Sequence, residues 1–123
     1  MNAVARLWDK GEPLDDAVLR FTAGGDHLLD DRLVPHDVRA SVAHARMLRR
    51  QGLLTEADFE AIRAGLEALA AEHAAGGWRV RLEDEDVHTA LETRLRERIG
   101  EAAERIHAGR SRNDQVLAAL RLW

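Results

Sequence analysis

Apolar residues recur every three or four positions over most of this chain, which is the spacing that places them on one face of an α-helix. Three such apolar stripes are clear, and each covers three to four helical turns. They are Val38-Val42-Ala45-Leu48, Phe59-Ile62-Leu66-Leu69 and Val87-Leu91-Leu95-Ile99. Residues that favour strands are sparse, with 4% aromatic residues and no tyrosine. The chain is therefore predicted to fold as an all-α protein.

Cap and turn residues predict where the first two long helices begin and end. The first should run over about 37–51, because Gly52 is a natural residue to follow a helix end. Thr55 followed by Asp58 is a capping-box pattern, which predicts a second helix that ends before Gly76-Gly77. A short turn joins the two, so we expect an antiparallel pair.

Weaker patterns cover the rest of the chain. A short helix is predicted over about 15–22, and residues 78–82 alternate as an extended segment without an obvious partner strand. An isolated strand is unstable, so this segment is expected to pack against the helices. Negative charge at residues 84–86 favours a helix start there. A shorter helix at about 101–107 and a last helix at 112–123 complete the prediction.

Composition and charge exclude several classes of protein. The chain has 22 acidic and 18 basic residues and a net charge of −4, which argues against a general nucleic-acid binder. It has no cysteine, so disulfides and thiol chemistry are excluded. No apolar run approaches the ~20 residues of a membrane span, and no signal core is present, so a cytoplasmic protein is expected. The six histidines lack metal-ligand spacing, and no metal is predicted.

Residues 107–115, His-Ala-Gly-Arg-Ser-Arg-Asn-Asp-Gln, carry the densest chemistry in the chain. Ser111 followed by Asp114 fits a capping box, and the exposed N–H groups of such a helix start attract anions. Arg110 and Arg112 add positive charge, and an arginine can grip a carboxylate through two hydrogen bonds. The segment therefore suits a small substrate that carries carboxylates. The same residues also fit an ordinary capped helix with two solvated arginines.

Residues 107–115 with the following valine resemble the signature His-Thr-Gly-Arg-Ser-Arg-Asn-Asp-Gln-Val of argininosuccinate lyase, in the fumarase/aspartase superfamily. Residues 37–48 are similar to the first long helix of that family, and residues 83–92 to its Asp-Glu-Asp-Ile-His segment. Residues 120–123 match the family sequence after the signature. One departure lies inside the signature, where Ala108 stands in place of the usual threonine. The resemblance covers nearly the whole chain.

The resemblance implies a fold and a reaction. Residues 1–111 would form the helical N-terminal domain of a homotetrameric enzyme, and residues 112–123 would begin its long central bundle helix. The reaction would be the cleavage of argininosuccinate to arginine and fumarate in arginine biosynthesis, without a cofactor. Residues 9–26 diverge from the family's Trp-Gly-Gly-Arg-Phe loop, so no substrate contact is carried over to them.

The resemblance also implies which side chains meet the substrate. Ser111, Arg112 and Asn113 would bind it, whereas Arg110 would either do the same or tie the loop to acidic neighbours. The resemblance also places His88 among the substrate-binding residues. It lies four residues before Glu92, so a pair on one helix face could orient its imidazole beside the site. The alternative for His88 is a solvated surface histidine.

The family's catalytic base does not occur in this sequence. It comes from a loop resembling Gly-Ser-Ser-x-Met-Pro-x-Lys-x-Asn, and the supporting Thr-His pair is also missing. General acid–base catalysis cannot be assembled without them, so the chain alone is expected to be inactive. Its expected partners are a dicarboxylate substrate and either the C-terminal part of the enzyme or another copy through the 112–123 helix. A stand-alone helical module that binds an anion or a partner, and a decayed fragment, remain as alternatives.

Overall fold

The computed structural model describes residues 30–107, 110 and 112–123, with only the backbone of residues 112 and 113. This part of the chain contains four α-helices: α3 (Val34–Arg50), α4 (Glu56–Ala74), α5 (Val87–Ile99) and α6 (Arg112–Leu122). Short 3₁₀ helices cover Asp31–Leu33, Leu82–Asp84 and Gly100–His107. No strand occurs within the described residues, and the all-α prediction is confirmed. The helix predicted at 15–22 lies outside them.

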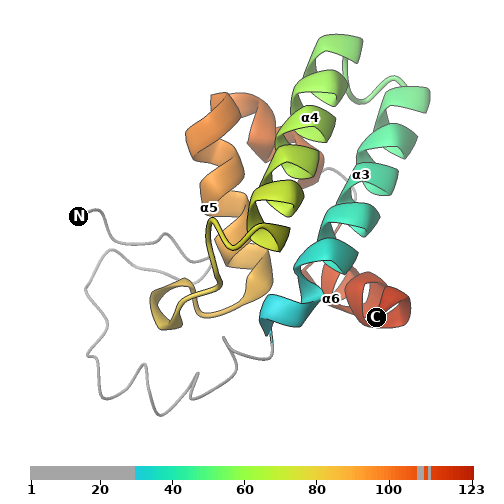
Figure 1. Ribbon diagram of the computed structural model, residues 1–123. Helices are drawn as coiled ribbons and strands as arrows, with labels where there is room; N and C mark the ends of the chain where they lie inside the picture. Colours follow the sequence, from blue (N-terminus) through green and yellow to red (C-terminus); the bar gives the residue numbers. More distant parts are fainter. Residues whose placement is uncertain (1–29, 108–109, 111) are drawn as a thin grey trace, which may run out of the picture.

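Helices α3 and α4 form the predicted antiparallel pair (Figure 1). Thr55 caps α4 as expected, because its hydroxyl accepts a hydrogen bond from the backbone N–H of Asp58 at 3.1 Å. Gly52 follows the end of α3 with a φ of 74°, a conformation that favours glycine. The predicted start of α3 at residue 37 is wrong, since the helix begins at Val34. Pro35 fits the first turn, where its missing N–H has no intrahelical partner to lose.

Helix α5 also begins and ends at cap residues. The carboxylate of Asp86 accepts a hydrogen bond from the backbone N–H of Thr89 at 2.7 Å, which caps the start of the helix. Gly100 ends α5 with a φ of 73° and a ψ of −141°, a combination open to glycine and costly for other residues. The helix predicted at about 101–107 is present in the tighter 3₁₀ form, over Gly100–His107.

The core lies between α3, α4, α5 and the Gly100–His107 segment. All three apolar stripes of the sequence point into it, with Ile99 half-buried at the end of the third stripe. The largest fully buried apolar side chains are Phe59, Leu48, Ile62, Val34 and Val87. Burial of this apolar surface is the main force that holds the helices together.

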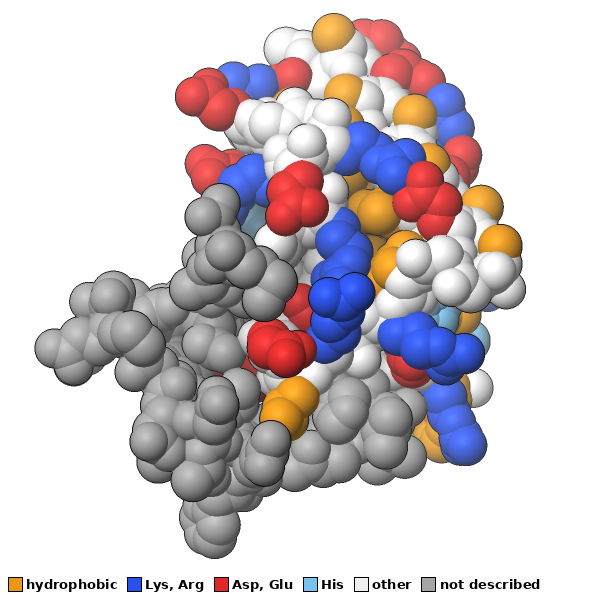
Figure 2. Space-filling model, turned by 60° about the vertical axis from the view of Figure 1, so that its left-hand side comes forward, with side chains coloured by type: hydrophobic (Ala, Val, Ile, Leu, Met, Phe, Trp, Pro, Cys, Tyr) orange, Lys and Arg blue, Asp and Glu red, His pale blue; other side chains and the backbone are white. Residues whose placement is uncertain are grey.

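Helix α6 packs against α3 (Figure 1). Ala119 and Gln115 are buried on its inner side, whereas Leu117, Leu120 and Trp123 are exposed. Figure 2 shows one face of the molecule, on which basic and acidic side chains are interspersed. Among the described residues, no helix is long and apolar enough to cross a membrane.

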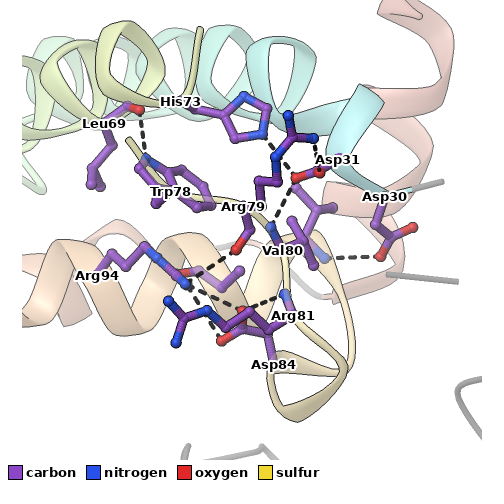
Figure 3. A network of polar contacts seen from close by, with 12 residues as sticks. Asp30, Asp31, Leu69, His73, Trp78, Arg79, Val80, Arg81, Asp84 and Arg94 are labelled. Atoms are coloured by element: carbon purple, nitrogen blue, oxygen red, sulfur yellow. Dashed lines mark hydrogen bonds and ion pairs between the residues drawn. The ribbon is translucent and has the colours of Figure 1, made fainter. Parts of the chain in front are cut away.

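Two aspartates before α3 hold the extended segment after α4 and the beginning of α5 in place (Figure 3). The carboxylate of Asp31 lies 2.9 Å from Nε2 of His73 and accepts a hydrogen bond from the backbone N–H of Val80 at 2.8 Å. The carboxylate of Asp30 accepts a hydrogen bond from the N–H of Val87 at 2.9 Å. Burial alone would raise the pKa of Asp31, but the Val80 N–H, His73 and Arg79 together hold it below its usual value.

The same segment contacts α5 and the end of α4 through aromatic and guanidinium groups (Figure 3). The indole N–H of Trp78 donates a hydrogen bond to the carbonyl of Leu69 at 2.9 Å. The guanidinium of Arg94 lies 4.5 Å from the centre of a Trp78 ring and pairs with the buried carboxylate of Asp84 at 3.3 Å. The expectation that residues 78–82 pack against helices as an extended segment is confirmed for residues 78–81, and Leu82 begins a 3₁₀ turn.

Candidate functional site

A cluster of buried polar side chains joins α3, α5 and α6; we call Asp37, Ser41, His88 and Gln115 the Asp37 cluster. Asp37 is fully buried at its centre, and Nδ1 of His88 lies 2.9 Å from one carboxylate oxygen. The side-chain amide of Gln115 donates to the two oxygens at 3.2 and 3.1 Å. Ser41 lies one turn along α3, with its hydroxyl 3.5 Å from the carboxylate. A buried carboxylate is tolerated because each of its oxygens has donors.

The expected pairing of His88 with Glu92 is wrong. His88 is at the second position of α5 and faces α3, where it is 3% exposed and contacts Asp37. It is therefore not a solvated surface histidine either. Glu92 lies instead 3.3 Å from Nε2 of His107, at the beginning of the signature segment. Helical spacing predicts that His88 and Glu92 share one face of a helix. In the structure each of them instead pairs with a residue outside α5.

In the part of the signature segment (residues 107–115) that the structure describes, His107, Arg110 and Gln115 contact the rest of the domain. His107 contacts Glu92 on α5, and Gln115 contacts Asp37 on α3. Between them, the guanidinium of Arg110 donates a hydrogen bond to the hydroxyl of Ser41 at 3.2 Å. Arg110 thus lies half-buried against the Asp37 cluster, and its hydrogen bond with Ser41 ties the signature segment to α3.

Ser111 and the side chains of Arg112 and Asn113 lie outside the described residues. The backbone of Arg112 begins α6. The first N–H groups of a helix have no intrahelical acceptor, and the helix dipole makes that end favourable for anions. A carboxylate of a small molecule is a suitable ligand for such a helix start when arginine lies beside it.

A cavity of about 20 Å³ lies against the Asp37 cluster and is lined in part by Leu95, His107, Arg110 and Gln115. This volume holds roughly one water molecule. This space is too small for a dicarboxylate. Among the residues that the structure describes, no group of three His, Cys, Asp or Glu side chains is placed to hold a metal ion.

Sequence reasoning missed Asp37, Ser41 and Gln115 as parts of this site. A signal was present for the first two, because they lie four residues apart within the apolar stripe of the first helix. A charged residue among Val38, Val42 and Ala45 has to be buried with a partner. Nothing in the sequence indicated that the partners would come from α5 and α6.

Comparisons with known proteins identify the family of this chain. A family model described as "Lyase" matches residues 15–123. The chain is 50% identical to the argininosuccinate lyase of Sorangium cellulosum over 118 residues, which are 96% of this chain and 27% of that protein. It is 44% identical to the argininosuccinate lyase of Thermotoga neapolitana over 95% of this chain and 29% of that protein. For the enzyme of Methylococcus capsulatus, the identity is 50% over all of this chain and 26% of that protein.

These matches cover nearly all of this chain but only part of each relative. The chain spans about a quarter of the length of the curated relatives it matches, in their N-terminal portion. The family model covers all but the first 14 residues, so it includes every element described above. This chain therefore belongs to the lyase family, as the signature at residues 107–115 indicated.

Proposed function

We propose that this chain is the N-terminal part of an argininosuccinate lyase, which cleaves the C–N bond of argininosuccinate without water to give arginine and fumarate. One observation carries the proposal: His107, Arg110 and Gln115 hold both ends and the middle of the signature segment on the domain. The stretch between Arg110 and Gln115 includes the residues expected to bind the substrate. High identity to argininosuccinate lyases supports the choice of substrate.

The proposed reaction needs hydrogen-bond donors at the carboxylate where negative charge develops. Removal of a proton beside a carboxylate leaves an intermediate with extra charge on that carboxylate, so fixed donors there lower the barrier. We assign Arg112 to grip a carboxylate through two hydrogen bonds, and Asn113 and Ser111 to add single ones. The general base and acid come from the remainder of the enzyme, and no step requires a cofactor.

The proposed partner is the rest of the enzyme, and α6 supplies the contact. Helix α6 has 11 residues, which is marginal for an isolated helix in water. Its exposed side includes Leu117 and Leu120, with exposed fractions of 51% and 49%, and Trp123 directly after the helix is 68% exposed. The rest of the enzyme, or other copies in a tetramer, would cover these side chains, and the burial of their apolar surface would stabilise the contact.

A fusion protein tests the proposal. The chain would be joined to the part of the Sorangium cellulosum enzyme that follows the matched region, and fumarate release would be followed by its ultraviolet absorbance. We expect sustained turnover of argininosuccinate by the fusion and none by the 123-residue chain alone. A folded fusion without turnover would refute the lyase assignment. Fumarate binding by that inactive fusion would favour an anion-binding module.

A further inference from the structure

We propose that Asp37 is a positioning residue, whose buried carboxylate fixes the first turn of α6 and thereby the side chains that meet the substrate. The catalytic consequence rests on the proposed function. The structural part, that Asp37 holds α6 in place, stands independently of it.

The burial of Asp37 and its contact with Gln115 support this positioning role. Its side chain is fully buried, and Gln115, the residue through which α6 reaches it, is 4% exposed. Both carboxylate oxygens lie within 3.2 Å of the Gln115 amide nitrogen. Gln115 follows Arg112 by three positions, which is just under one helical turn. A shift of Gln115 therefore moves the beginning of α6 with it.

A second route from Asp37 reaches the signature segment through Ser41. The Ser41 hydroxyl lies 3.5 Å from Asp37 and accepts a hydrogen bond from Arg110 at 3.2 Å. The contacts of Gln115 and Arg110 with α3 thus involve Asp37 or its direct neighbour Ser41. A contact between His107 and Glu92 holds the segment at its beginning.

The position requires a carboxylate rather than an amide. An ionised carboxylate only accepts hydrogen bonds, so it can face the Gln115 amide and His88 Nδ1 at the same time. The contact with His88 is a hydrogen bond when Nδ1 carries the proton, because a carboxylate oxygen only accepts. Asparagine at position 37 would turn an NH₂ group toward one of these donors. One buried donor would then lose its acceptor, which costs more than an exposed hydrogen bond.

Hydrogen exchange of the 123-residue chain tests the structural part. In Asp37→Asn, the backbone amides of α6 should exchange about tenfold faster relative to those of α4, the factor expected for loss of one buried hydrogen bond. The matched control is Asp84→Asn, since Asp84 is also a buried carboxylate but contacts Arg94 and the N–H of Arg81. The control should leave the ratio of α6 to α4 exchange unchanged. An equal ratio in Asp37→Asn and Asp84→Asn would overturn the proposal.

Two further variants separate positioning from general stability. In Asp37→Asn with Gln115→Glu, donor and acceptor exchange places, so the protection of α6 should return toward that of the unaltered chain. Failure of this pair to restore it would count against a direct Asp37–Gln115 link. If Asp37→Asn does not fold, Gln115→Met takes its place, because it removes the donor on α6 and keeps the contacts of Asp37 with His88 and Ser41.

Kinetics of the fusion enzyme test the catalytic part. Asp37→Asn should lower kcat/KM at least about tenfold, mostly through KM, because displaced binding groups weaken substrate and transition state together. The exchanged pair should recover most of the loss, and Asp84→Asn should change kcat/KM less than about twofold. An unchanged KM in Asp37→Asn would overturn this part. A fusion without any turnover refutes the lyase assignment instead, and the exchange experiment still decides whether Asp37 holds α6.

Discussion

Replacement of Asp31 should destabilise the domain in a way that depends on pH. Its carboxylate is 13% exposed and accepts a hydrogen bond from the Val80 N–H at 2.8 Å beside its contact with His73. Val80 itself is 3% exposed, so alanine at position 31 leaves a buried N–H without this acceptor. Hydrogen bonds to charged groups contribute about 1.5–3 kcal/mol each and do not add fully. We expect Asp31→Ala to lower the free energy of unfolding by about 2–3 kcal/mol at neutral pH.

The pH dependence follows from the lowered pKa of Asp31. Burial opposes the charge of the carboxylate, but the Val80 N–H, His73 and Arg79 outweigh it and bring the pKa below the unfolded value of 3.8. The stabilisation is therefore complete above the unfolded pKa and is lost as the pH falls through the folded pKa. Asp31→Asn keeps an acceptor for Val80 but loses the charge. Its deficit relative to the unaltered chain should shrink in acid.

Denaturant unfolding measured between about pH 7 and about pH 3 checks this prediction. The control is Glu60→Gln, because Glu60 also has a lowered pKa, caused first by its hydrogen bond with Arg63, yet it is exposed to solvent. The control should change stability little at any pH, as expected for an exposed ion pair. If Asp31→Asn costs as much stability in acid as at neutral pH, the charge of the Asp31 carboxylate does not stabilise the fold.

Three further predictions concern the backbone and the core. Gly100→Ala should lower the free energy of unfolding by about 1–3 kcal/mol, because its φ of 73° and ψ of −141° strain any residue with a Cβ; an unchanged melting temperature would contradict this. Glu85 has a φ of 71° in a γ-turn closed by a 2.9 Å hydrogen bond between its neighbours, so Glu85→Gly should be neutral or stabilising. The control Glu83→Gly, in the adjacent 3₁₀ turn, should destabilise the domain. Equal melting temperatures of the two variants would contradict the strain at Glu85. Phe59→Ala should cost about 3–5 kcal/mol, since Phe59 is 2% exposed in the core, and denaturant unfolding that finds less than about 1 kcal/mol would contradict its central place.

The helices could be predicted because their signals are local. Thr55 and Asp58 lie in one turn, and the stripe from Phe59 to Leu69 is a pattern within one helix. The predicted start of α3 is three residues late, because the helix includes Pro35 in its first turn, where proline is accepted. The 3₁₀ form of Gly100–His107 has no distinct sequence pattern that separates it from a short α-helix.

The polar partners could not be predicted, because they are distant in sequence. His88 pairs with Asp37, 51 positions away, and His73 pairs with Asp31, 42 positions away, whereas helical spacing indicates only neighbours on one helix. The substrate-binding assignment of Ser111, Arg112 and Asn113 still rests on the family signature. The structure adds that Gln115, inside that signature, is turned to the Asp37 cluster.

We propose that residues 111–113 form the carboxylate-binding part of a lyase site that the rest of the enzyme completes. The most direct test is kcat/KM of the fusion enzyme with Arg112→Lys, which keeps the positive charge but removes the two-pronged grip on a carboxylate. We predict a loss of about 100-fold or more, as for removal of one donor to a developing negative charge. Arg121→Lys, at an exposed position on the same helix, should leave kcat/KM unchanged. Full activity of Arg112→Lys in a working fusion would contradict the account.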